Sequence, residues 1–343
     1  MRTTRCLTFL SVVLLAAVGW SPGDVSGADP AGASLWAVPA AALLAEYQPV
    51  TYLYRQDWKP VAVETVLSSA LLERSSLSGW RIVGVDPTAN SLPAFSKGFR
   101  LDIKGCTPAR NLDTCYRNPA ASAPPVAIVY GRAWANPVVS APIQDVLEYW
   151  FFSYLDDWRN SLSKPTTWQI HGGDWEVDLV ALGSDGAPLE VAYSQHDRGV
   201  VRPWANVPIA GGTHPLDYVA LGSHANYFTV GRLGEPGTPH LIQPSFSGIP
   251  LAEPDFTSSQ TSYGPAGLAQ HPAQVVDISG GAAWLNLAGP WGDGNYLLIG
   301  SGSNDPNAYL HLRVGASPTG PALHDVWRNP LDAFRDWPAD DGH

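Results

Sequence analysis

The sequence predicts a mainly β fold, an antiparallel β-sandwich with a short N-terminal helical decoration. From Val126 onward, short runs of β-branched and aromatic residues alternate with Gly, Pro and Asn, which is the pattern of strands joined by turns. The chain holds 33 Gly and 31 Pro, and only 15% of its residues are charged. No fixed period recurs, so we expect one domain over residues 47–330 and not a repeat array.

The expected elements follow in chain order. An Ala-rich extension at 29–46 carries a short helix, and the alternating segment Pro49–Tyr54 is a strand. Apolar residues with the spacing of an amphipathic helix then follow at Val63, Val66, Leu67, Ala70 and Leu71. Residues 84–124 are rich in Pro, Asn and Ser and are predicted to form a surface loop. The strands expected after it are Val126–Trp134, Leu147–Leu155, Trp175–Leu182, Leu189–His196, Asp217–Leu221, Val275–Ile278 and Tyr296–Ile299. Residues 331–343 are expected as a C-terminal tail.

The N-terminus predicts export. Arg2 and Arg5 precede an apolar run from Cys6 to Trp20, and small residues end at Ala28, as in a secretory signal peptide over residues 1–28. The alternative is a retained membrane anchor, although the run is short for a transmembrane helix. No later segment approaches the length of a span. We therefore expect a secreted chain with no transmembrane segment after cleavage.

The net charge and the aromatic content limit the classes of binding partner. The net charge is −11, which excludes the electrostatic footprint of a nucleic-acid-binding protein. An acidic chain is also repelled by anionic membranes unless a cation bridges the contact. The 14 Trp residues indicate either a large core or a surface that faces sugar or lipid.

Two cysteines remain after signal cleavage, Cys106 and Cys115. A lone pair that closes a short loop in an exported protein predicts a disulfide. The alternative is two unpaired thiols. No histidine lies near enough in sequence to make the pair an attractive zinc site.

The segment 171–179 carries the strongest functional signal. It places a histidine and three acids inside a predicted buried strand, in which Asp174, Glu176 and Asp178 share one face. The apolar residues between them face the core: Trp175, Val177 and Leu179. Neighbouring carboxylates repel one another unless positive charge lies among them, so the row predicts a metal ion.

The expected ligands are oxygen-rich. Asp174 and Glu176 are the direct ligands, and three histidines at strand ends are either ligands or hold water ligands: His171, His196 and His224. Asp156 and Asp157 could add oxygen donors. Carboxylates without thiolates favour calcium or magnesium over zinc. A three-histidine zinc site is the alternative, but it leaves the acids unexplained.

Several of these residues also have structural interpretations. Asp178 could form a salt bridge with an arginine, and His214, which precedes Pro215, could cap a turn. His196 and His224 could each be structural histidines. A serine nucleophile is disfavoured, because Ser223 and His224 are adjacent on a strand and no G-x-S-x-G segment occurs.

Four ordered motifs resemble the vacuolar-protein-sorting-associated protein 62 family. They are His171–Glu176, Tyr193–His196, Gly212–Pro215 and Ala220–Tyr227. Flanking segments resemble the same family at Tyr52–Leu67, Leu147–Phe152, Gly289–Gly292 and Gly320–Trp327. The resemblance covers roughly residues 47–330. It implies no defined activity, because that family has none.

The hexapeptide His171–Glu176 is also similar, more remotely, to the motif of the necrosis- and ethylene-inducing (Nep1-like) cytolysins. The resemblance implies a β-sandwich with Asp174 and Glu176 as ligands of a divalent cation, and with His171 and His224 nearby. The cytolysin motif has a second histidine where this chain has Gly173. The resemblance therefore extends to the acids and not to the toxin activity.

The leading hypothesis is a secreted, divalent-cation-binding β-sandwich that engages a polar surface ligand, either a glycan or a lipid headgroup. Metal can bridge an acidic protein to hydroxyl or phosphate oxygens. The alternatives are a metal-assisted hydrolase that acts on a glycan or phosphoester at the same site, and a structural metal without chemistry.

Overall fold

The computed structural model describes residues 38–54, 59–107, 110, 126–159, 165–196, 198–233, 255–300 and 302–340, with the backbone of two short strands at 245–246 and 249–250. These residues belong to one compact unit, residues 35–343. The predicted signal peptide and Cys115 lie outside the described residues. No helix in the described ranges is both long and apolar enough to span a bilayer.

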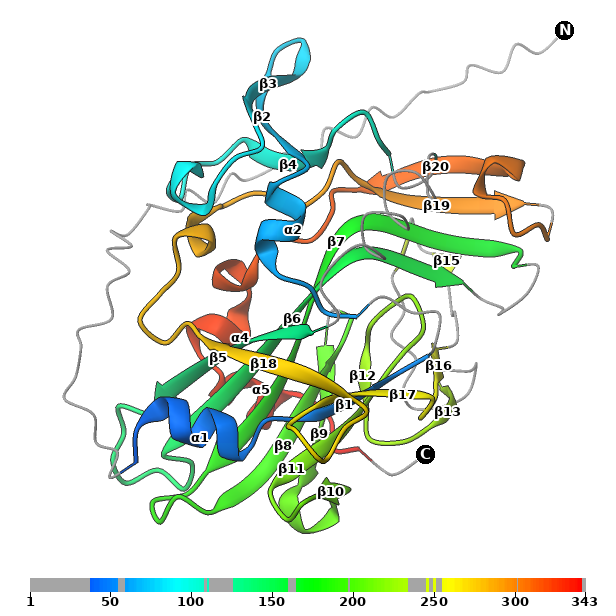
Figure 1. Cartoon of the computed structure of the whole chain (residues 1–343). Helices are drawn as coiled ribbons and strands as arrows, with labels where there is room; N and C mark the ends of the chain where they lie inside the picture. Colours follow the sequence, from blue (N-terminus) through cyan, green and yellow to red (C-terminus); the bar gives the residue numbers. More distant parts are fainter. Residues whose placement is uncertain are drawn as a thin grey trace, which may run out of the picture. The chain divides into compact units, whose positions relative to one another are not determined.

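A 13-stranded curled sheet forms the body of this unit (Figure 1). Two long, adjacent strands, β6 (Asp145–Arg159) and β7 (Thr167–Leu182), pair along almost their whole length. The other strands of this sheet are β1 (Val50–Leu53), β5 (Ala127–Ala135), β8 (Pro188–Gln195), β9 (Arg198–Pro203), β10 (Ile209–Ala210), β11 (His214–Val219), β12 (Asn226–Tyr227), β17 (Thr261–Gly264), β18 (His271–Asp277), β19 (Asn295–Gly300) and β20 (Tyr309–Gly315).

Smaller sheets and short helices complete the unit. A three-stranded sheet has the order β3-β2-β4, with β2 (Ala70–Ser76), β3 (Gly79–Val85) and β4 (Phe99–Ile103). Two strand pairs are β13 (Gly231–Leu233) with β16 (Asp255–Thr257), and β14 (Ser245–Phe246) with β15 (Ile249–Pro250). The α-helices are α1 (Ala40–Glu46), α2 (Val63–Leu67), α4 (Asp325–Arg328) and α5 (Leu331–Asp336). The 3₁₀ helices are η1 (Ala89–Ser91), η3 (Trp204–Asn206), η4 (Ala283–Asn286), η5 (Pro306–Ala308) and η6 (Pro321–Leu323).

Both faces of β6 and β7 are covered by apolar layers, because successive side chains of a strand point to opposite faces. One layer contains Trp150, Phe152, Trp175, Val177 and Leu179, with residues of α2, η4 and α5. The other contains Leu147, Tyr149, Phe151, Val180 and Leu182, with residues of α1. Each strand is therefore buried almost from end to end. This is why 171–182 reads as a buried strand despite its acids.

The mainly β class is confirmed, and a sandwich-like arrangement is consistent with the curled sheet. The sheet is mixed, however, and not wholly antiparallel. The pairs β1–β11, β17–β18 and β18–β5 are parallel, because strands distant in sequence return to the same sheet. Helices also occur at the C-terminal end, where residues 331–340, expected as a tail, form α5 and pair with β9.

Two sequence expectations for the N-terminal third are wrong. The predicted helix that reaches Leu71 ends at Leu67, and Ala70 and Leu71 begin β2. Residues 84–124 contain β4 in addition to loop. In both places short, local apolar runs fit either secondary structure, and pairing among β2, β3 and β4 decides the outcome.

Candidate metal centre

Three buried residues form a group that could hold a metal ion: Asp156, Asp174 and His224. Each offers one ligand atom, and these atoms all lie within 4.8 Å of one another. Asp156 lies on β6, Asp174 on the neighbouring strand β7, and His224 in the loop between β11 and β12. Three segments that are distant in sequence therefore meet at one point.

The backbone around this group has an unusual conformation. His224 has φ 58° and His196 has φ 60°, in the left-handed region that costs a non-glycine residue about 1 kcal/mol or more. Gly173 has φ +64°, and a Cβ there would lie 2.4 Å from the carbonyl oxygen of Trp291. A histidine at position 173, as in the cytolysin motif, therefore does not fit this backbone.

Hydrogen bonds orient the group. The Nδ1 of His224 donates to Asp174 Oδ2 at 2.9 Å, and the backbone N–H of Trp175 donates to Asp174 Oδ1 at 3.0 Å. The Nδ1 of His171 donates to the carbonyl of Gly173 at 2.9 Å. The Nε2 of His171 then faces Asp156 Oδ2 at 3.7 Å. That oxygen is buried and accepts no hydrogen bond among the described residues.

Burial and mutual repulsion separate the proton affinities of the acids. Burial, followed by the charge of Asp174, raises the pKa of Asp156 well above its usual value. The same two causes raise the pKa of Glu176. Burial alone would raise the pKa of Asp174, but hydrogen bonding and charge from His224, together with the charge of His171, hold it below its ordinary value. Burial lowers the pKa of His171 and favours its neutral form.

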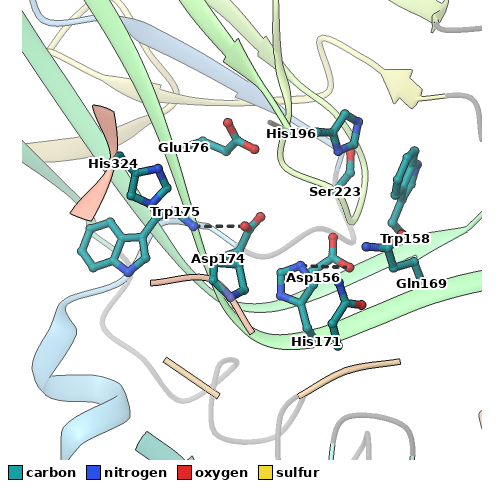
Figure 2. Close-up of a pocket in the computed structure, with 12 residues that line it drawn as sticks. Asp156, Trp158, Gln169, His171, Asp174, Trp175, Glu176, His196, Ser223 and His324 are labelled. Carbon is teal, nitrogen blue, oxygen red and sulfur yellow. Dashed lines mark hydrogen bonds and ion pairs between the residues drawn. The ribbon is translucent and has the colours of Figure 1, made fainter. Parts of the chain in front are cut away.

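Two members of the group, Asp156 and Asp174, line a cavity of about 280 Å³. Figure 2 shows Asp156 and His171 close together beside Asp174, with Glu176 and His196 higher in the view. The lining residues are Asp156, Trp158, Gln169, His171, Asp174, Trp175, Glu176, His196, Ser223, Asn295, Pro318 and His324. None of these is a lysine or an arginine. The side chain of His196 is 19% exposed, so solvent reaches at least one of the lining residues.

Glu176 and His196, both predicted as site residues, line this cavity but are not members of the three-residue group. Glu176 accepts a hydrogen bond from the Ser194 hydroxyl. The Nε2 of His196 donates to Asp255 Oδ2 at 3.0 Å, and its ring stacks on Trp158 at 4.2 Å between centroids. Both side chains are thus held by the protein at the cavity wall.

Sequence reasoning missed the carboxylate that organises the His196 side of the cavity. Asp255, at the start of β16, is buried and also accepts hydrogen bonds from Ser223 at 2.5 Å and Tyr227 at 2.6 Å. No motif surrounds it. Its local sequence, Glu253-Pro254-Asp255-Phe256, has no neighbouring histidine or cysteine that would indicate a site. His324, which also lines the cavity, was missed as well, because Pro318 is the one other lining residue near it in sequence.

The remaining candidate residues are placed as follows. Asp178 accepts a hydrogen bond from the Asn226 side chain at 2.8 Å, and it forms no salt bridge with an arginine of the described ranges. The Nδ1 of His214 donates to the Gln48 carbonyl at 2.8 Å, a structural contact. Cys106 is buried. Its expected partner lies outside the described residues, so the Cys106–Cys115 disulfide stays a prediction.

The chain matches no protein-family model and no curated protein, so the resemblance to the vacuolar-protein-sorting-associated protein 62 family has no support. Several solved structures are similar at low scores. "NLPPya in complex with glucosamine" is 15% identical over 56% of this chain and 68% of that chain, with a TM-score of 0.31. Necrosis and Ethylene inducing Protein 2 from the causal agent of cocoa's Witches Broom disease is 19% identical over 55% of this chain and 67% of that chain, with a TM-score of 0.29. The structure "Toxin fold for microbial attack and plant defense" is 10% identical over 72% of this chain and 77% of that chain, with a TM-score of 0.35.

Proposed function

We propose that this protein, exported through residues 1–28, binds a hard divalent cation, calcium or magnesium, at Asp156, Asp174 and His224. The cation would then hold an oxygen of a polar ligand, either a glycan hydroxyl or a lipid headgroup. The observation that carries the proposal is the convergence of these three buried ligand atoms within 4.8 Å of one another, beside the cavity that Asp156 and Asp174 line.

The electrostatics of the cavity support a cation. Asp156, Asp174 and Glu176 are all buried, and buried carboxylates are costly unless they are paired, protonated or bound to a metal. No lysine or arginine lines the cavity. A bound cation would supply the missing positive charge, and Asp156 Oδ2, which accepts no hydrogen bond among the described residues, is an available oxygen donor.

The donor set supports calcium or magnesium over zinc. Two carboxylates and one imidazole contribute more oxygen than nitrogen, and no thiolate takes part. Oxygen donors suit hard cations, whereas structural zinc sites are built mostly from cysteine and histidine. Glu176, His171 and His196 line the same cavity and would hold water or ligand oxygens around the ion.

The cavity suits a small polar ligand. A volume of about 280 Å³ lies at the lower end of small-molecule sites, and Gln169, Asn295 and Ser223 add hydrogen-bonding groups. Trp158 and Trp175 line the cavity but are buried against other rings. Recognition through the ion and polar groups is therefore favoured over stacking of a sugar on an open indole face.

The test is binding of chelator-treated protein to glycan and lipid arrays, with and without calcium or magnesium. We expect cation-dependent binding that Asp174→Asn abolishes, whereas Asp325→Asn, on an exposed helix, leaves it unchanged. Binding that persists in chelator, or that survives Asp174→Asn, would contradict the proposal.

A second candidate is metal-assisted hydrolysis of a glycan or phosphoester. It is favoured by the opposite pKa shifts of Glu176 and Asp174, raised and lowered respectively, in one cavity, because such a pair suits general acid and base roles. Glu176→Gln would then abolish product release while ligand binding remains. Absence of turnover on every array ligand that binds would eliminate this candidate.

A further inference from the structure

The hairpin of β2 and β3 is a second surface, separate from the cavity. Figure 1 shows it extending beyond the neighbouring strands, and β3 is the outer strand of its sheet. Five of the thirteen exposed large apolar side chains among the described residues lie in this hairpin. They are Leu77, Trp80, Ile82, Val83 and Val85. Exposed apolar groups concentrated on one feature indicate an interaction site.

The apex of the hairpin is apolar. Ser76 pairs with Gly79, so Leu77 and Ser78 form the two-residue connection. Leu77 is fully exposed, at 111% of its reference area. A large aliphatic side chain at the tip of an extended hairpin has no fold-stabilising contact. Burying it in an apolar medium would gain about 1.5–3 kcal/mol.

Two arginines lie opposite each other below this apex. Arg74 on β2 pairs directly with Arg81 on β3, and both are exposed. Like charges in this cross-strand position destabilise a hairpin. Neither arginine forms an ion pair within the described part of the chain, and Arg74 instead lies over the Phe99 ring at 5.6 Å. The pair presents two guanidinium groups to an external anion.

The local charge contrasts with that of the whole chain. Residues 70–104 contain five basic side chains, Arg74, Arg81, Lys97, Arg100 and Lys104, and three acidic ones, Glu73, Asp86 and Asp102. Their net charge is +2 in a chain whose net charge is −11. The repulsion expected between the acidic chain and an anionic surface is thus reversed at this sheet.

We propose that the β2–β3 hairpin docks on an anionic lipid bilayer, with Leu77 inserted and with Arg74 and Arg81 against the lipid phosphates. A strand rises about 3.3 Å per residue, so both arginines lie roughly 10 Å from the apex. That distance matches the ~5–10 Å over which interfacial segments bury apolar groups below the headgroups. Trp80, between the apex and Arg81, lies at the level where indole rings favour the interface.

The test is co-sedimentation of the full chain with vesicles of phosphatidylcholine, with and without phosphatidylserine. Chelator is present throughout, so that the proposed cation site cannot contribute to vesicle binding. The result is therefore independent of whether that site binds a metal. The apolar run at 6–20 is common to every variant and cancels in the comparison. We expect binding that requires phosphatidylserine and falls as salt rises.

The variants separate the two contributions. Arg74→Gln with Arg81→Gln should weaken binding by roughly fivefold for each arginine, and Leu77→Ser by roughly tenfold. The matched controls are Arg328→Gln with Arg335→Gln, which change the charge equally on exposed helices, and Leu310→Ser, which removes another exposed leucine. The controls should bind as the parent chain does. The hairpin variants should melt no lower than the parent chain, because the double arginine variant loses a cross-strand repulsion and Leu77 is fully exposed.

Two results would overturn the proposal. One is equal binding to both kinds of vesicle, or binding that the hairpin variants do not weaken. The other is a chain that ignores vesicles but self-associates in sedimentation velocity, with the association lost in Ile82→Lys. That result would assign the exposed edge of β3 to a second copy of this chain.

Discussion

Replacing Asp156 with asparagine separates the role of this side chain as a ligand from its role in stability. Its Oδ2 atom accepts no hydrogen bond among the described residues, so the change breaks no hydrogen bond to that atom within them. It keeps the size of the side chain but removes a negative charge beside Asp174. We therefore expect an apo protein that is at least as stable as the parent chain but that no longer responds to calcium or magnesium.

The structure sets the magnitude. Two unit charges no more than 4.8 Å apart, as the ligand atoms of this group are, repel by at least about 3.5 kcal/mol at an effective dielectric constant of ~20. Protonation of Asp156 relieves part of this in the apo protein, because burial and the charge of Asp174 raise its pKa. About 3.5 kcal/mol is thus the scale of the repulsion that a cation offsets and that the asparagine removes.

The assay is thermal unfolding of chelator-treated protein with increasing calcium or magnesium. A cation at 100 times its Kd stabilises the parent chain by about 2.7 kcal/mol, or roughly 5 °C in melting temperature for a domain of this size. The response should weaken at lower pH, because protons compete with the cation for carboxylates of raised pKa. Asp156→Asn should show no cation-dependent rise at any pH.

An Asp156→Asn protein that keeps the cation response of the parent chain would contradict the role of Asp156 as a ligand. A parent chain without any response would refute the metal site itself. Asp178→Asn is the matched control, because Asp178 is a buried acid on the same face of β7 but outside the three-residue group. It should respond to cation as the parent chain does, and a lost response there would mean that the whole acid row binds the ion.

Two further predictions test the backbone and the titration of a second acid. Gly173→Ala should destabilise by about 3 kcal/mol or more through strain and the clash with Trp291, whereas Gly186→Ala, at φ +77° in open space, should cost only about 1 kcal/mol in urea unfolding; equal losses would contradict the clash. Burial, and then the charge of Asp293, raises the pKa of Asp102 to about 7, above the ~4 of the unfolded chain. The folded state therefore binds this proton more tightly, and its contribution to stability is lost as pH rises from about 4 through 7. Asp102→Asn should flatten that part of the urea midpoint profile, and an unchanged slope would contradict the assignment.

The acid-bearing strand was predictable because its information is local. A period of two separates the core face of Trp175, Val177 and Leu179 from the acid face without any knowledge of neighbouring strands. The core face packs as expected. Asp156 could be named as a donor because it ends a run of aromatic residues, and pairing of β6 with β7 places it opposite His171.

The His196 side of the cavity could not be predicted from local sequence patterns. Asp255 meets His196, Ser223 and Tyr227 only through the pairing of β16 with β13 and the return of β12 to β11. Loop conformations at His196 and His224, both at positive φ, likewise depend on long-range contacts. The hairpin of β2 and β3 was misread because Ala70 and Leu71 fit a helical spacing as well as a strand.

The acid row of β7 shows two ways in which buried carboxylates are accommodated. Asp174 and Glu176 face the cavity, where an ion can enter and where the proposal assigns one. Asp178 is two residues further along the same face, fully buried and outside the cavity lining. Burial, and then the charge of Asp217, raises its pKa well above the ordinary value. A hydrogen bond from the Asn226 amide and a retained proton can therefore stabilise the buried Asp178 carboxyl, as a cation would stabilise that of Asp174. Acids that alternate along one strand thus need not all bind the same ion.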